Sequence, residues 1–191
     1  MEDYDGSKVL TALKALFGAV IGALPGMAIW IIFGKLGFIT LVSGMAIAMG
    51  VVFLCSFFAG DSDLSPLVLL IICGVVFITA ILISEKIVWT MEMSDLLSEY
   101  LPTFREKMID AIIAENPDIS RTDADGMITD DLYNQLFTET FGIKEATFGE
   151  CFSNFGTLLE NLEMKGKYIS SLVKSIVFGG FGGFLFFAKI M

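Results

Sequence analysis

Three long stretches of this chain contain no charged residue. They run from Ala15 to Gly34, from Leu36 to Gly60 and from Leu64 to Ser84. A helix needs about 20 apolar residues to cross the hydrocarbon core of a bilayer, which is about 30 Å thick. Each stretch is long enough for one crossing, so the sequence predicts an all-α integral membrane protein.

A fourth apolar stretch lies near the end of the chain. Residues 169–188 contain only one charge, Lys174, near the start of the stretch. A lysine at the end of a membrane helix can extend its ammonium group to the lipid headgroups. We therefore expect four transmembrane helices, the last at 168–191. A re-entrant or interfacial segment is the alternative for this last stretch.

The charge of the chain is concentrated between the third and fourth stretches. Residues 85–167 carry 17 acidic and 7 basic side chains, which gives this region the whole net charge of −10. The predicted organisation is an N-terminal flank at 1–14, a three-span membrane segment at 15–84, an acidic helical soluble region at 85–167 and the fourth span. The acidic surface repels nucleic acid, so we expect no nucleic-acid partner. It either attracts cations or a basic partner, or serves as a solvated surface.

Polar and apolar spacing predicts helices in this acidic region. Ser94 and Thr129 each precede an acidic turn, as helix N-caps do. Apolar residues from Phe148 to Leu162 recur at helical spacing, which predicts one amphipathic helix. Its polar face is not enriched in lysine or arginine, so packing within a bundle is favoured over lying on the membrane surface.

Small residues recur every four positions in the first apolar stretch. Gly18, Gly22 and Gly26 lie on one helix face, and the last stretch repeats the spacing with Gly179 and Gly183. Such rows let membrane helices approach closely. We interpret them as helix-packing sites, either between helices of one chain or in a homo-oligomer.

The residue content argues against several kinds of chemistry. The chain has no histidine and three cysteines without a CxxC pair, so nucleophilic triads with histidine and zinc sites are not indicated. The three apolar stretches contain no ionisable residue, which argues against proton-coupled transport. We expect no enzymatic activity and no cofactor.

One local motif is a candidate metal loop. Asp123, Asp125 and Gly126 match the third, fifth and sixth positions of an EF-hand calcium loop. Arg121 and Leu132 then occupy the first and twelfth positions, where the motif needs acids. The alternative is a turn that leads into a helix capped by Thr129.

The first hairpin carries a resemblance to known proteins. The residues from Gly22-Ala23-Leu24-Pro25-Gly26 to Trp30, then Gly34–Ile39 and Ser43-Gly44, resemble small uncharacterised four-span membrane proteins of Gram-positive gut and rumen bacteria. The resemblance implies a bacterial protein with its N-terminus inside and its acidic region outside. It implies no function.

These observations lead to one expected function and one alternative. We expect a multi-pass cell-membrane protein that acts as a non-enzymatic scaffold or accessory protein and binds a partner through its acidic region. The alternative is a small transporter or channel subunit that acts as a homo-oligomer. Both termini are expected to be cytoplasmic, because more lysines precede the first stretch than follow it directly. The lysine count over all flanks favours the opposite orientation.

Overall fold

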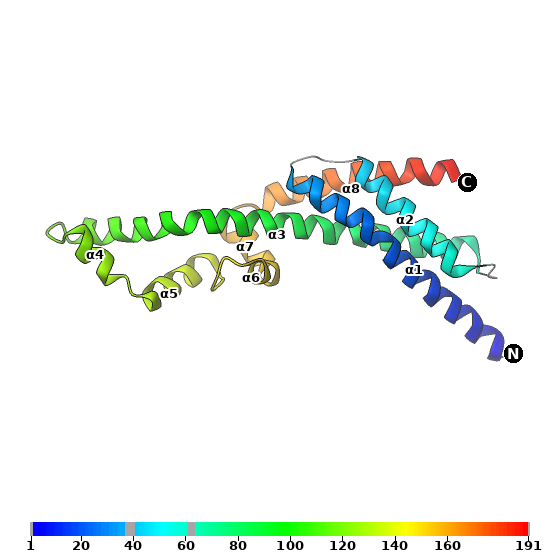
Figure 1. Cartoon of the computed structure of the whole chain (residues 1–191), viewed down its shortest axis with the longest axis horizontal. Coiled ribbons are helices and arrows are strands. Elements are labelled where there is room, and N and C mark those ends of the chain that lie inside the picture. Colours follow the sequence, from blue (N-terminus) through cyan, green and yellow to red (C-terminus); the bar gives the residue numbers. More distant parts are fainter. Residues whose placement is uncertain (1, 37–40, 61–63, 191) are drawn as a thin grey trace. The chain divides into compact units, whose positions relative to one another are not determined.

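The computed structural model describes residues 2–36, 41–60 and 64–190, with side chains described for 6–36, 42–60 and 64–181. These residues form eight α-helices and no strand (Figure 1). The helices are α1 (Glu2–Lys35), α2 (Leu41–Ala59), α3 (Pro66–Glu115), α4 (Arg121–Met127), α5 (Asp130–Phe141), α6 (Phe148–Ser153), α7 (Phe155–Asn161) and α8 (Lys165–Ile190). The predicted all-helical fold is confirmed for the described chain.

Three of the helices are long and apolar enough to cross a membrane. They comprise residues Gly6–Lys35 of α1, Val42–Ala59 of α2 and Pro66–Glu115, which is α3. They contain most of the three uncharged stretches, so membrane association is supported. The predicted fourth span falls in α8, where the side chains of 182–190 lie outside the described residues.

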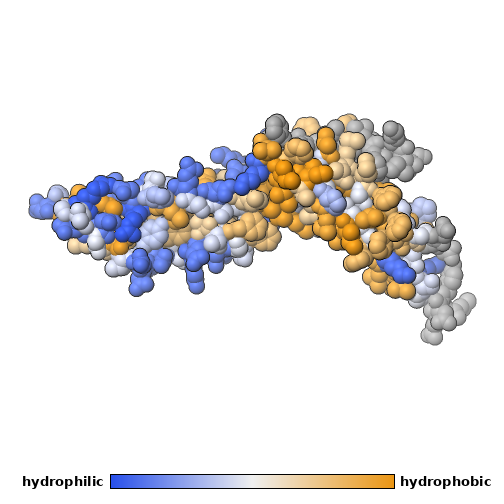
Figure 2. Space-filling model, in the orientation of Figure 1, coloured by the Kyte–Doolittle hydropathy of each residue, from blue (hydrophilic) through white to orange (hydrophobic). Residues whose placement is uncertain are grey.

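The chain divides into two compact units. The first consists of residues 1–88 and 169–191, and the second of residues 89–168. Both α3 and α8 contribute to each unit. In Figure 2, hydrophobic side chains predominate on the coloured surface of the first unit, whereas hydrophilic side chains are frequent on the second.

Each unit has its own buried core. The core of the first unit is built largely from small and branched residues, among them Ala15, Ala19, Ala23, Ile47, Val51, Cys55 and Ile81, and it also contains Trp30 and Phe77. The core of the second unit is rich in aromatic rings. Phe104 of α3 lies edge-on to Phe137 and Phe141 of α5, with ring centroids 5.9 and 5.7 Å away. Close-packed aromatic pairs stabilise a fold by more than the burial of their apolar area alone.

The third helix extends further than the sequence indicates. The sequence predicts a helix cap at Ser94, but α3 continues unbroken from Pro66 to Glu115. The Ser94 hydroxyl donates instead to the carbonyl of Ala146, at 2.9 Å. Residues after the third apolar stretch, including Met93 and Leu97, are fully buried in the second unit. Tertiary packing therefore outweighs the local capping signal.

The amphipathic segment at 148–162 forms two helices and not one. Asn154 has non-helical backbone angles (φ −103°, ψ 23°) and separates α6 from α7. Its side-chain amide donates to the carbonyl of Glu150 at 3.1 Å, which ends α6. The predicted buried face is confirmed at Cys151, Phe155 and Leu158, whereas Phe148 at its start is exposed.

Candidate functional site

Glu85 is a buried carboxyl group in the unit that holds the apolar helices. Its side chain is only 4% exposed. It follows the last residue of the third uncharged stretch and belongs to the first compact unit. Ionisable residues buried among membrane helices are rare and mark functional or structural sites. Glu85 is therefore the strongest candidate in this unit.

Two other helices donate hydrogen bonds to this carboxyl group. The indole Nε1 of Trp30, on α1, donates to Oε2 at 3.3 Å. The hydroxyl of Ser171, on α8, donates to Oε1 at 2.6 Å. A carboxylate accepts hydrogen bonds at both oxygens, so the two donors compensate part of the cost of its burial. The group connects three helices through polar contacts.

Further hydroxyl groups are buried in the same unit. Ser43 of α2 and Ser84 of α3 are fully buried, and neither hydroxyl has a hydrogen-bond partner among the described residues. Ser175, one turn after Ser171 on α8, is also buried. Buried hydroxyls without partners are uncommon in native proteins. The first unit thus holds several polar groups in addition to Glu85.

The glycine row of α1 lies against α2 of the same chain. A Cβ atom at Gly22 would collide with the backbone of Gly50, and one at Gly18 with the backbone of Leu54. A Cβ at Gly26 would lie 2.5 Å from the amide nitrogen of Ile47. All three glycines are buried. The row is occupied within the chain and is not left open for a second copy.

The glycines of α8 are placed in part. A Cβ at Gly44 of α2 would lie 2.6 Å from the Cα of Gly179, so these two helices also approach closely. A Cβ atom added at Gly179 would in turn lie 3.0 Å from Cη2 of Trp30. Gly183 belongs to α8, and its surroundings lie outside the described residues.

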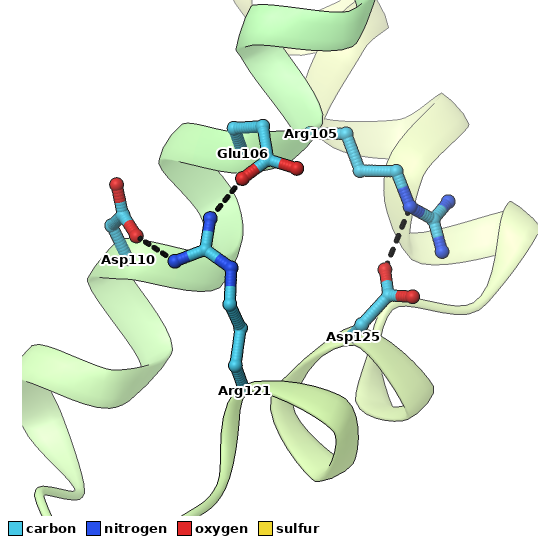
Figure 3. Close-up of polar contacts among 5 residues, drawn as sticks. All are labelled: Arg105, Glu106, Asp110, Arg121 and Asp125. Atoms are coloured by element: carbon cyan, nitrogen blue, oxygen red, sulfur yellow. Dashed lines mark hydrogen bonds and ion pairs between the residues drawn. The ribbon is translucent and has the colours of Figure 1, made fainter.

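In the second unit, the two aspartates of the candidate calcium loop lie on a helix. Asp123 and Asp125 belong to α4, and Asp125 accepts a hydrogen bond from Nε of Arg105 at 2.9 Å (Figure 3). Asp123 stands at the N-terminus, where the Ser120 hydroxyl lies 2.7 Å from its carboxylate. No group of three or more potential metal ligands is found among the described residues. The partners of the two carboxylates in the structure are Arg105 for Asp125 and Ser120 for Asp123.

Arg121 completes this group of ion pairs. Its guanidinium group contacts the carboxylates of Glu106 and Asp110 on α3 (Figure 3). The hydrogen bonds to these two acids raise the pKa of Arg121. These pairs connect α4 to α3. Because they are exposed to solvent, they add little to the free energy of folding.

A shallow polar pocket lies on the same unit, next to α5. It has a volume of about 710 Å³. Its lining residues are Asn134, Gln135, Thr138, Glu139, Lys144 and Glu145. Two carboxylates and one ammonium group give it a weakly acidic character, which is shared with the rest of the unit.

The uncharged stretches end before Glu85, so the sequence places this residue in the acidic region and not among the apolar helices. Its helical spacing, however, indicates that Glu85 is buried. Glu85 lies four residues after Ile81 and eight after Phe77, so all three share one face of α3. Ile81 and Phe77 are buried, and the face they define continues to Glu85.

Comparisons with protein-family models, with curated proteins and with solved structures find no match to this chain.

Proposed function

We propose that this chain is a four-span membrane protein that acts as a scaffold or accessory protein. Its second unit, residues 89–168, is the part that binds a partner. The proposed partner is a protein with a basic surface. The proposal keeps the topology that the sequence and the resemblance imply, with α8 as the fourth span.

One observation carries the proposal. The second unit holds 16 acidic and 6 basic residues, and none of its acidic side chains is buried. The unit nevertheless has its own apolar core, which includes Met93, Phe137 and Leu158. A folded unit with so unbalanced a surface has a strong negative field, which steers and orients positively charged partners.

Crosslinking in native membranes tests this proposal. A crosslinker that joins amines to amines, followed by mass spectrometry, should recover a protein joined through the lysines of residues 89–168. Substitution of three exposed acids (Glu99→Gln, Glu115→Gln, Asp118→Asn) should lower the yield several-fold, because it removes three charges. The control set Thr103→Ser, Thr122→Ser and Thr140→Ser keeps the charge and should leave the yield unchanged. An equal yield from both sets contradicts the proposal.

Glu85 favours a second candidate function. A buried carboxyl group among helices that span a bilayer is a common element of ion and proton pathways. We propose as the alternative a transporter or channel subunit that acts as a homo-oligomer. Reconstitution in liposomes distinguishes the two. Solute flux that is lost in Glu85→Gln and kept in the exposed control Glu92→Gln would establish the alternative and displace the scaffold.

A further inference from the structure

A groove lies beside the contact between α1 and α2. It is lined by Leu13, Lys14 and Phe17 of α1 and by Phe57 and Phe58 of α2, and has a volume of about 550 Å³. We call it the α1–α2 groove. The groove is open to the surroundings and is not an enclosed cavity.

The close approach of the two helices shapes this groove. Because Gly18 has no side chain, the backbone of α2 lies directly against it, with the Cβ of Phe58 at the same contact. Phe58 meets Phe17 edge-on, with centroids 6.0 Å apart, and meets Phe57 at 5.8 Å. These rings form an apolar wall that continues to Leu13.

The wall is open to the surroundings. Phe57 is 72% exposed and Phe17 is 59% exposed. Exposed aromatic rings on a helix that crosses a bilayer contact hydrocarbon chains, which are as apolar as the rings. Such a groove can accept an acyl chain.

Lys14 supplies the polar end of the groove. It is exposed, and it is the last charged residue before the first uncharged stretch. A lysine at this position lies at the level of the lipid headgroups. Its ammonium group attracts a phosphate, and the attraction is stronger when no positive group of the lipid neutralises that phosphate.

From this combination we propose that the α1–α2 groove binds one anionic phospholipid. The acyl chain packs against Phe17, Phe57 and Leu13, and the phosphate pairs with Lys14. The inference rests on the proposed insertion of α1 and α2 in a bilayer. It is independent of the partner that the second unit binds.

Retention of defined lipids tests the proposal. The full chain is reconstituted in an equimolar mixture of phosphatidylglycerol, phosphatidylethanolamine and phosphatidylcholine. It is then extracted in mild detergent, and the lipids that stay bound are identified by native mass spectrometry. Asp61 and Asp63 follow α2 in the sequence and lie outside the described residues, so phosphatidylethanolamine is included as a lipid whose ammonium group could pair with them.

We expect phosphatidylglycerol to be retained in preference to both other lipids. Lys14→Gln should lower this preference about fivefold, the factor that corresponds to the attraction of one lysine to an anionic membrane surface. Lys174→Gln removes the same charge from α8 and should leave the preference unchanged. Phe57→Ala should lower the number of lipids bound, whereas Phe53→Ala should not. Phe53 is equally exposed, one turn away, and does not line the groove.

The opposite results separate the two proposals. A chain that fails to float with liposomes contradicts both membrane insertion and the lipid site. A chain that floats but retains lipids in the proportions of the mixture contradicts only the lipid site. So does an equal loss of preference in Lys14→Gln and Lys174→Gln, and so does preferential retention of phosphatidylethanolamine.

Discussion

Glu163 occupies a backbone position that glycine usually fills. Its φ is +55°, in the left-handed region, and it is the first residue after the C-cap of α7. The amide of Glu163 donates to the carbonyl of Glu160, and that of Met164 donates to Leu159. This pair of hydrogen bonds defines a Schellman motif, in which glycine is preferred at the position that Glu163 holds.

We predict that Glu163→Gly stabilises the second unit. A side chain in the left-handed region costs about 1–3 kcal/mol, and the extra freedom of glycine in the unfolded chain offsets about 0.5–1 kcal/mol of the relief. The free energy of unfolding should rise by roughly 1 kcal/mol in a denaturant titration. Glu139→Gly, inside α5, should lower it by about the same amount. A loss in both variants would contradict the prediction.

Cys151 offers a second prediction for a single residue. Burial raises the pKa of its thiol above the ordinary value, and the side chain is fully buried. The thiolate is the reactive form, so a neutral maleimide should modify Cys151 far more slowly than a free thiol at neutral pH. The rate should still be rising with pH where that of a free thiol has levelled off, because the pKa of Cys151 is raised.

Exposure can be separated from chemistry with a matched pair of thiols. Ser153 is exposed two residues later. In the double variant Cys151→Ser, Ser153→Cys the thiol should react at the rate of a free cysteine.

The raised pKa of Cys151 also has a consequence for stability. The folded state keeps its proton, so the stabilisation present below the ordinary thiol pKa is lost as the pH rises through the raised value.

At the scale of the elements, the α1–α2 pair is the contact most sensitive to substitution. We predict that Gly22→Leu lowers the temperature of thermal aggregation in detergent by at least 10 °C, roughly what a loss of a few kcal/mol produces in a chain of this size. The added side chain would meet the backbone of Gly50. Ala28→Leu should change the temperature little, because Ala28 is exposed. Equal effects would show that α1 and α2 do not pack through this row.

The long helices were predictable because membrane length is a strong constraint. An uncharged run of 20 residues has few alternatives, and three helices of sufficient length and hydropathy are confirmed. The N-cap at Thr129 is also confirmed, because its hydroxyl accepts from the amide of Leu132. The length of an apolar run and an N-cap hydrogen bond each depend on residues of a single helix.

What the sequence did not reveal depends on contacts between distant residues. Ser94 has the sequence of a cap, yet its hydroxyl bonds to Ala146, 52 residues away. The partners of Glu85 lie 55 and 86 residues away, at Trp30 and Ser171. Local periodicity can place Glu85 on a buried face, but it cannot name these donors.

At the scale of the whole molecule, the proposed topology makes a measurable prediction. With four spans, the N-terminal flank and residues 89–168 lie on opposite sides of the membrane. A cysteine at Asp118 should react with an impermeant thiol reagent added to intact cells, whereas one at Ser7 should react only after permeabilisation. Both positions are exposed. The reverse pattern would invert the orientation, and labelling of both from outside would contradict the four-span count.

The hydrogen bond between Ser171 and Glu85 also sets an order of assembly. Ser171 leaves the ribosome 86 residues after Glu85, which takes roughly 4–17 s at about 5–20 residues per second. During this interval α1, α2 and the first half of α3 are already made, but the Glu85 carboxyl group lacks the hydrogen bond from Ser171. The last helix thus supplies a hydrogen bond that chains ending before residue 171 lack, and such chains should be degraded faster than the full chain in a pulse-chase experiment.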